Sequence, residues 1–233
     1  MKTNKLAVSL KEQNRPSIWL IIAVNSIILW SISRANAIEL TGMGAVLAAA
    51  ATLLPVGLGV VIATVLNGLL SSDAKERLVF LRRDHVLPGH RAFSKYAKSD
   101  PRIDVAGLEK LLGSPLPSDP VEQNSAWYSK LYKVVENEPA VSQVHKDYLL
   151  LRDYTGLSVL VLIIYGAIGL FAIQSTKVWG VYFLLLITQF VLVRQAASQR
   201  GVRFVTTVLA QASARQVDAP APEPSAKKKK KKN

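Results

Sequence analysis

The hydrophobic positions of this chain are gathered into four long stretches, and a long polar segment separates the second stretch from the third. A helix that spans a membrane needs about 20 mostly apolar residues. None of the stretches shows the polar stripe, repeating every three or four positions, that is typical of a helix in a soluble protein. The pattern predicts an all-α membrane protein with four transmembrane helices paired as two hairpins. The stretches are 17–33, 42–70, 156–173 and 178–193.

The same pattern predicts the domain boundaries. A small helical domain is expected between the second and third spans, and a helical extension is expected after the fourth. The apolar stretches are too long and too uniform for the alternating strands of a membrane barrel. One alternative stays open for the first stretch, because its basic start and Ala35-Asn36-Ala37 also fit a cleavable signal peptide. The predicted segments are an N-terminal tail 1–16, hairpin 17–71, helical domain 72–154, hairpin 155–195, extension 196–217 and basic tail 218–233.

Basic residues beside the apolar stretches predict how the chain faces. Lysine and arginine in short flanking segments favour the cytoplasmic side of a membrane. The two short links within the hairpins carry only Arg34 and Lys177 as basic residues, whereas both tails and the middle segment are rich in them. Both termini and the helical domain are therefore expected in the cytoplasm, with the protein spanning the cell inner membrane several times.

The net charge of +13 lies mostly at the two ends of the chain. Six consecutive lysines, 227–232, follow a linker rich in proline and alanine. A tail of this composition is expected to be disordered. Beside a membrane it would attract anionic lipid, and it would contact nucleic acid only non-specifically, if at all. Its simplest role is to keep the tail soluble and to fix topology.

The polar middle segment predicts short helices. Asp104 is placed to cap a helix over 105–112, which Gly113 would end. Asp119 and Pro120 predict the start of a helix that runs to about residue 136. A further helix is expected to begin at Pro139 and continue into the third span, while 73–83 is expected to continue the second. The predicted core residues are Leu108, Leu111, Leu112, Trp127, Leu131, Tyr132, Val135, Val144, Tyr148 and Leu151.

The densest polar cluster of the middle segment is the candidate binding site for a ligand or partner. Arginine forks grip phosphate well, so the cluster would suit a nucleotide or a lipid headgroup. The alternative is a loop beside the membrane that is held by aspartate–arginine pairs. The candidate residues are Arg82, Arg83, His85, His90, Arg91, Asp100, Arg102 and Asp104.

The sequence offers no catalytic, metal or cofactor signature. The chain has no cysteine, and the spacing of its three histidines matches no zinc pattern. No phosphate-binding loop or nucleophile elbow is present, so no catalytic residue, metal or cofactor is expected. Pro55, with Gly57 and Gly59, would make a hinge or a packing surface in the second span. The spans lack charged residues at mid-depth, which argues against a coupled transporter.

These features favour a non-enzymatic membrane protein that couples a cytoplasmic sensing or partner-binding module to an anchor or an oligomeric pore. The expected partners are the lipid bilayer, further copies of the chain and a cytoplasmic protein. The plan, a few spans joined to a small cytosolic module, resembles membrane components of bacterial antiphage defence systems in architecture alone. The alternatives are a membrane enzyme acting on lipid or nucleotide through the segment 90–104, and a scaffold that shapes membranes.

Overall fold

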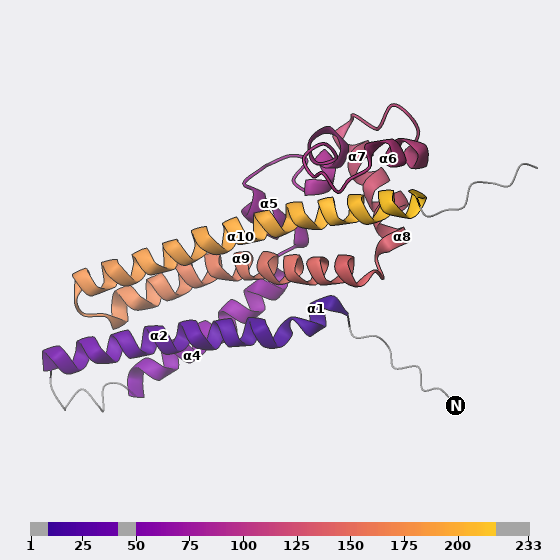
Figure 1. Cartoon of the computed structure of the whole chain (residues 1–233). Helices are drawn as coiled ribbons and strands as arrows, with labels where there is room; N and C mark the ends of the chain where they lie inside the picture. The colour runs from indigo at the N-terminus through magenta and orange to yellow at the C-terminus, as the bar shows by residue number, and fades with distance from the viewer. Residues whose placement is uncertain (1–8, 42–49, 218–233) are drawn as a thin grey trace, which may run out of the picture.

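Helices make up all the regular structure of the described residues, which are 9–41 and 50–217 of the computed structural model. The long helices α2 (Arg15–Thr41), α4 (Ala50–Leu69), α9 (Pro139–Ala172) and α10 (Thr176–Val217) lie along one another, and a short helix α1 (Leu10–Gln13) precedes α2 (Figure 1). Helix α9 contacts each of the other three and forms its most extensive interface with α10. The fold is therefore organised around the α9–α10 hairpin.

Several of these helices are long and apolar enough to cross a membrane. Residues 10–35, 139–172 and 176–215 meet this condition, and a fourth span is obtained if α4 is taken together with the bent segment that follows it. Leu20, Ile27, Val61, Phe171 and Leu184 are all exposed on the long helices. An apolar surface of this extent is expected where helices face lipid rather than water. The prediction of an all-α fold is confirmed, and three or four of its helices are long and apolar enough to span a membrane.

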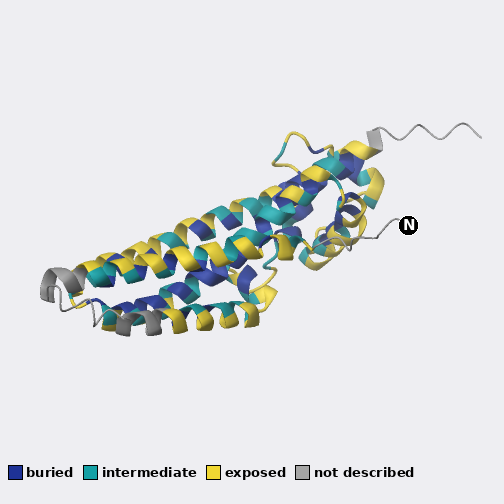
Figure 2. Ribbon diagram, turned by 90° about the horizontal axis from the view of Figure 1, so that it is seen from below, coloured by how far each residue is buried: buried dark blue, intermediate teal, exposed yellow. Residues whose placement is uncertain are grey.

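The candidate spans pack through small residues and a few polar bonds. The Ser26 hydroxyl of α2 lies 2.7 Å from the Tyr165 hydroxyl of α9, within hydrogen-bonding distance. Gly166 of α9 leaves room for the ring of Phe183, because a Cβ at this position would lie 2.9 Å from that ring. The buried positions run along the faces that the helices turn toward one another (Figure 2). The core between the spans consists of Ile22, Leu29, Ala63, Leu157, Val161, Tyr165, Ile173, Tyr182 and Leu186.

The second span does not continue straight into the polar segment, so the prediction that 73–83 extends it was wrong. Helix α4 ends at Leu69, and the next helix, α5 (Ser72–Phe80), departs at an angle of 97°. The backbone of Ser71 is extended, and its hydroxyl accepts a hydrogen bond from the Ala74 amide, so Ser71 caps α5 as a new helix. A serine at the N-cap satisfies an amide that a continuous helix would not expose.

The remaining elements form a polar domain, defined here as residues 72–135 with 139–154 of α9 and 196–217 of α10. Its core combines residues between 92 and 148 with residues 204–212 of α10, which are distant from them in sequence but lie beside them in the fold (Figure 1). Seven of the ten predicted core residues are buried, whereas Leu111 is 36% exposed. Phe204, Val205, Val208 and Leu209 of α10 are buried in the same core. After α5, the domain's short elements are η2 (Pro88–Arg91), η3 (Ala92–Tyr96), α6 (Val105–Leu112), α7 (Pro120–Ala126), η4 (Trp127–Tyr132) and α8 (Lys133–Val135).

The predicted helix ends in this domain are largely confirmed. Asp119 caps α7 by accepting from the amides of Val121 and Glu122. Gly113 ends α6 with a φ of +96°, a conformation that glycine adopts without strain. Asp104 occupies the N-cap of α6 but makes no side-chain capping bond. Helices α9 and α10 are continuous from the candidate spans into the domain. This agrees with the helix predicted from Pro139 into the third span and with the helical extension predicted over 196–217. The basic tail 218–233 lies outside the described residues.

Candidate functional site

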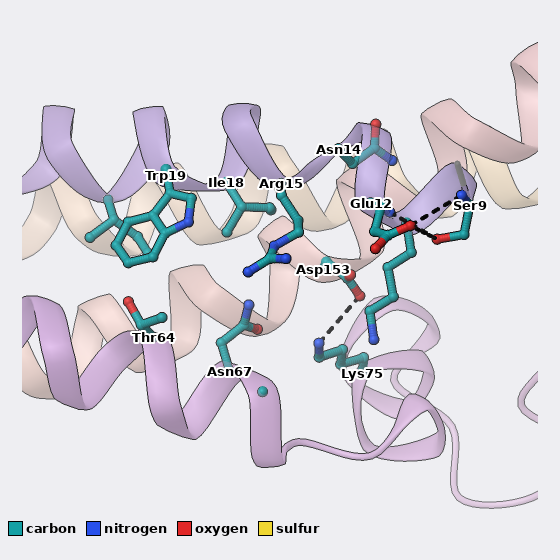
Figure 3. Close-up of a pocket in the computed structure, with 13 residues that line it drawn as sticks. Ser9, Glu12, Asn14, Arg15, Ile18, Trp19, Thr64, Asn67, Lys75 and Asp153 are labelled. Carbon is teal, nitrogen blue, oxygen red and sulfur yellow. Dashed lines mark hydrogen bonds and ion pairs between the residues drawn. The ribbon is translucent and has the colours of Figure 1, made fainter. Parts of the chain in front are cut away.

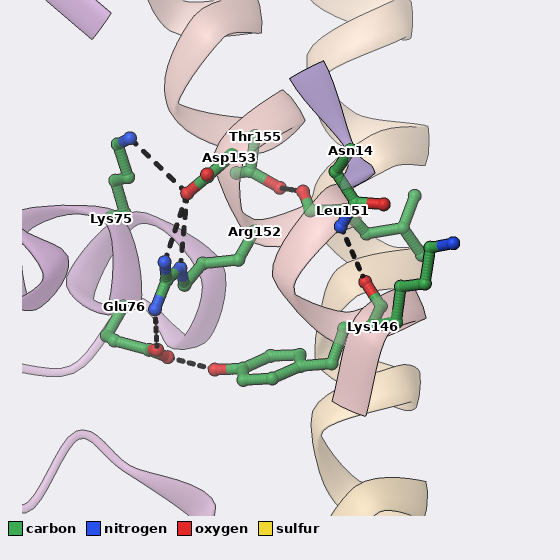
Figure 4. A network of polar contacts seen from close by, with 9 residues as sticks. Asn14, Lys75, Glu76, Lys146, Leu151, Arg152, Asp153 and Thr155 are labelled. Atoms are coloured by element: carbon green, nitrogen blue, oxygen red, sulfur yellow. Dashed lines mark hydrogen bonds and ion pairs between the residues drawn. The ribbon is translucent and has the colours of Figure 1, made fainter. Parts of the chain in front are cut away.

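A buried network of charged side chains joins α5 to α9 where the apolar and polar parts of the fold meet (Figure 4). Lys75 Nζ lies 3.3 Å from Asp153 Oδ1. Arg152 donates from Nη2 to Asp153 Oδ1 over 3.1 Å and from Nη1 to Glu76 Oε1 over 3.4 Å. Tyr148 donates its hydroxyl proton to the other oxygen of Glu76. We call this set of five residues the junction network.

The bend after α4 and two glycines bring the network together. Because α5 begins at Ser72, Lys75 and Glu76 lie in its first turns, next to α9. Gly156 of α9 allows this approach, since a Cβ there would lie 3.2 Å from Lys75 Cγ. Gly201 of α10 does the same for the Tyr148 ring, which would lie 2.8 Å from an added Cβ. These two glycines therefore make room for the side chains of Lys75 and Tyr148.

The charges of the network balance, and its charged side chains are almost fully buried. The side chains of Lys75 and Asp153 are 4% and 10% exposed, and those of Arg152 and Glu76 are 9% and 4% exposed. Burial raises the pKa of Glu76, although hydrogen bonds from Tyr148 and Arg152 oppose this shift. Burial lowers the pKa of Lys75, against the attraction of Asp153. Two cations and two carboxylates in contact compensate one another, whereas an unpaired member would be costly.

An aromatic cavity of about 180 Å³ in the polar domain borders the network. The imidazole of His145 stacks on Phe204 with ring centroids 4.5 Å apart. Burial lowers the pKa of His145 to about 4, so its ring is neutral at pH 7. Trp127 has a buried Nε1 without a hydrogen-bond partner among the described residues. The cavity is lined by Glu76, Leu87, Pro88, Gly89, Asn124, Trp127, Tyr128, Tyr132, His145, Tyr148, Leu149, Arg152 and Phe204.

A second cavity, of about 470 Å³, borders the network on the side of the spans (Figure 3). Lys75 and Asp153 belong to its wall, whereas Glu76, Tyr148 and Arg152 belong to the wall of the aromatic cavity. The network therefore separates a cavity of the polar domain from a cavity among the candidate spans. The second cavity, called the junction cavity below, is lined by Ser9, Lys11, Glu12, Asn14, Arg15, Ile18, Trp19, Ile22, Thr64, Asn67, Gly68, Lys75 and Asp153.

The structure divides the polar cluster predicted from the sequence into separate groups. Arg83, His85 and His90 line one cavity of about 240 Å³. The rings of His85 and His90 are 5.3 Å apart, and Arg91 donates to the His85 carbonyl. Burial lowers the pKa of His90. Arg82 is exposed at the start of the connection that follows α5.

The second group lies against α10. Asp100 and Arg102 line a groove of about 540 Å³ together with Arg203. Arg102 Nη2 lies 2.6 Å from Asp100 Oδ2, and its hydrogen bonds lower the pKa of Asp100 to about 2. The Asp104 amide donates to Ser213 of α10. The Asp100–Arg102 contact is the aspartate–arginine pairing that the loop interpretation anticipated.

The glycines predicted as a hinge or packing surface lie within α4. Gly59 contacts α9, since a Cβ there would meet Ile168 at 2.9 Å and Tyr165 at 3.0 Å. Among the described residues, none lies within 4 Å of an added Cβ at Gly57. The side chain of Pro55 lies outside the described residues. Close packing against α9 therefore accounts for Gly59.

Sequence reasoning missed every charged member of the junction network. One signal was present, because Arg152 and Asp153 stand immediately before a long run without charge. Adjacent opposite charges at such a boundary have to find partners as the chain enters an apolar environment. Their partners Lys75 and Glu76 could not be chosen from the sequence, which offers several other lysines and glutamates in the polar segment.

The comparisons with known proteins add no functional assignment. A scan against protein-family models, a search of curated proteins and a search of solved structures each found no match to this chain. Within 9–41 and 50–217, no three His, Asp or Glu side chains form a group that could hold a metal ion. The functional interpretation therefore depends on the geometry of the junction network and the cavities beside it.

Proposed function

We propose that this chain is a non-enzymatic four-span membrane protein that couples the state of a cytoplasmic polar domain to its spans. In this proposal α4 is the second span, and the bend at Ser71 is its exit on the cytoplasmic side of the cell inner membrane. Both termini and the polar domain then face the cytoplasm. The scarcity of basic residues in the links within each hairpin supports this orientation.

The position of the junction network carries the proposal. It is the buried polar contact between α5, which is joined directly to α4, and α9, which is continuous with the polar domain. A packed, charge-balanced network tends to hold discrete arrangements, because intermediate ones would leave a charge without a partner. A shift of α9 relative to α5 would therefore reach α4 as a change in its angle to the polar domain.

The aromatic cavity supplies a place where such a change could start. An occupant would touch Tyr148 and Arg152, two members of the network that belong to the cavity wall. A ligand or a side chain of a protein partner shifts this equilibrium only if it binds one arrangement better than the other. The cavity volume of about 180 Å³ suits a small aromatic group.

The spans in this proposal serve as an anchor or as an oligomeric pore, with a cytoplasmic protein partner for the polar domain. This plan is the one that resembles membrane components of bacterial antiphage systems. The enzyme hypothesis receives less support, because His90 lines one cavity whereas Asp100 and Arg102 line another. No observation specifically favours a scaffold that shapes membranes.

The absence of cysteine makes the topology directly testable. Gln174→Cys places a single thiol in the exposed link between α9 and α10, and Ser118→Cys places one on the exposed surface of the polar domain. A membrane-impermeant maleimide should label the first variant in intact cells and the second only after lysis. Labelling of the Ser118→Cys variant in intact cells would overturn the proposed orientation.

Coupling is tested by a distance between the two parts of the molecule. Spin labels at Leu58→Cys on α4 and Ser118→Cys on the polar domain report how these parts are arranged in nanodiscs. Glu76→Gln removes one charge from the network and should shift or broaden the distance distribution. Glu122→Gln, an exposed carboxylate on α7, is the matched control and should leave it unchanged. If the distance distribution of the Glu76→Gln variant is the same as that of the parent chain, the coupling proposal is wrong.

A further inference from the structure

The junction cavity has an apolar wall and a cationic end. Ile18, Trp19 and Ile22 of α2 form the apolar wall, on the side of the candidate span. Lys11, Arg15 and Lys75 bring positive charge to the other end, where α1, α5 and α9 meet (Figure 3). Asn14 connects this end of the cavity to α9, because its Nδ2 donates to the Lys146 carbonyl of that helix over 2.9 Å. The cavity is thus amphipathic along the direction of the spans.

The cationic end carries more positive charge than the cavity itself neutralises. Among the described residues, Lys11 and Arg15 form no ion pair, whereas Lys75 is paired with Asp153. The Glu12 carboxylate accepts from the amide and hydroxyl of Ser9 in a capping box. Glu12 and Asp153 are the two carboxylates of the cavity wall, against the three cations Lys11, Arg15 and Lys75. An anion between Lys11, Arg15 and Lys75 would relieve the repulsion between these like charges.

A polar atom at the side of the cavity also lacks a partner. Asn67 of α4 has a buried Oδ1 without a hydrogen bond in the described part of the chain. The neighbouring Thr64 donates its hydroxyl to the Val60 carbonyl of its own helix. A buried acceptor of this kind is costly unless a donor reaches it. Because Asn67 also lines the cavity, a turn of its amide would bring Oδ1 within reach of a ligand hydroxyl held close to the cations.

We propose that the junction cavity binds an anionic phospholipid, with its phosphate diester against the three cations and an acyl chain along the apolar wall. The glycerol hydroxyls of phosphatidylglycerol provide the donor that Asn67 lacks. The inference rests on the proposed function in one respect, the placement of the junction at a membrane surface. Basic pockets between transmembrane helices at the cytoplasmic surface are suited to such headgroups.

Lipid binding at this site reaches the junction network directly. The phosphate would compete with Asp153 for Lys75, whose ammonium contacts both the cavity and the network. Arg152 already contacts Asp153 at 3.1 Å and holds that carboxylate when Lys75 turns toward the lipid. The lipid composition of the membrane thereby biases the contact between α5 and α9.

Native mass spectrometry of the full chain in detergent tests the site. Phosphatidylglycerol and phosphatidylcholine with identical acyl chains are titrated separately. Lys11→Gln/Arg15→Gln should weaken phosphatidylglycerol binding by about thirtyfold, as expected for two cations that face a net negative headgroup. Phosphatidylcholine binding should weaken much less, because the choline cation offsets the charge of its phosphate. Lys110→Gln/Lys130→Gln removes two exposed cations of the polar domain and is the matched control. Gly68→Phe adds a ring to the cavity wall without changing charge. It should be tolerated, because no described residue lies within 4 Å of an added Cβ at Gly68.

The outcomes separate this inference from the proposed function. Equal binding of the two lipids, or equal effects of the two double substitutions, would overturn the lipid site. Displacement of the lipid by millimolar sn-glycerol 3-phosphate would show that a free phosphate ester is the ligand and would also overturn it. Loss of phosphatidylglycerol binding in Gly68→Phe supports it. Detergent exposes both ends of the spans, so an error in the proposed orientation appears in the cysteine labelling and not in this assay.

Discussion

Arg152 of α9 donates a hydrogen bond to Glu76 of α5 over 3.4 Å, although the two residues are 76 positions apart in the sequence. Both side chains are buried, and both are linked to a second partner of the network. This contact ties the helix that follows the α4–α5 bend to the central helix of the fold.

Removing Arg152 should destabilise the protein strongly. Arg152→Met keeps a similar side-chain length but leaves Glu76 and Asp153 with Lys75 as their only cation in the network. Breaking a buried pair in this way costs about 3–5 kcal/mol. The measurement is the apparent free energy of unfolding in detergent by chemical denaturation.

The matched control for Arg152→Met is Arg102→Met. Arg102 pairs with Asp100, but its side chain is 57% exposed. Exposed ion pairs contribute about 0–1 kcal/mol, so this variant should remain close to the parent chain. Similar losses of stability in the two variants would show that burial does not increase the contribution of the network to the free energy of unfolding.

Stability should fall in mild acid because of His145. Its pKa in the folded protein is about 4, below the value of about 6.5 expected in the unfolded chain. Between these values the unfolded state binds a proton that the folded state does not, so stability rises with pH in this range and is lost as the pH falls from 6.5 toward 4. Thermal unfolding at pH 7 and pH 5 measures the effect. His145→Phe keeps a ring beside Phe204 and should reduce the difference; an unchanged difference would assign it to other groups.

Alanine substitution at two glycines of α10 should have different consequences. A Cβ at Gly201 would lie 2.8 Å from the rings of Phe80 and Tyr148, so Gly201→Ala should cost about 1–3 kcal/mol through overpacking. At Gly180 no heavy atom of the described residues lies within 4 Å of an added Cβ, so Gly180→Ala should cost nothing. Melting temperatures in the same detergent compare the two variants. Equal melting temperatures would contradict the close approach of α10 to α5 and α9.

The hydrogen bond between Ser26 and Tyr165 should contribute little to stability. Hydrogen bonds between transmembrane helices contribute about 0.6 kcal/mol on average, and Tyr165→Phe keeps the buried ring. The expected result is a small loss in the free energy of unfolding, with Ser26→Ala giving no additional loss in the double variant. A loss of several kcal/mol would mean that the tyrosine hydroxyl has a further role between α2 and α9.

The sequence by itself determined the features that depend on neighbouring residues. A run of apolar residues long enough to cross a bilayer is recognisable without any tertiary contact, and so are the cap at Asp119 and the end of α6 at Gly113. These features follow from the local hydrogen-bonding needs of a helix and from the cost of burying a backbone without partners.

The tertiary structure alone decided which charged residues meet. The sequence predicted a site within Arg82–Asp104, yet the fold places His85 and His90 in one cavity and Asp100 in another. It buries Glu76 and Arg152 together instead. The bend at Ser71 determines this outcome, because it turns α5 toward α9 rather than extending it from α4. Partners so far apart in the chain are selected by the path of the backbone, and that path depends on packing between helices that no local pattern encodes.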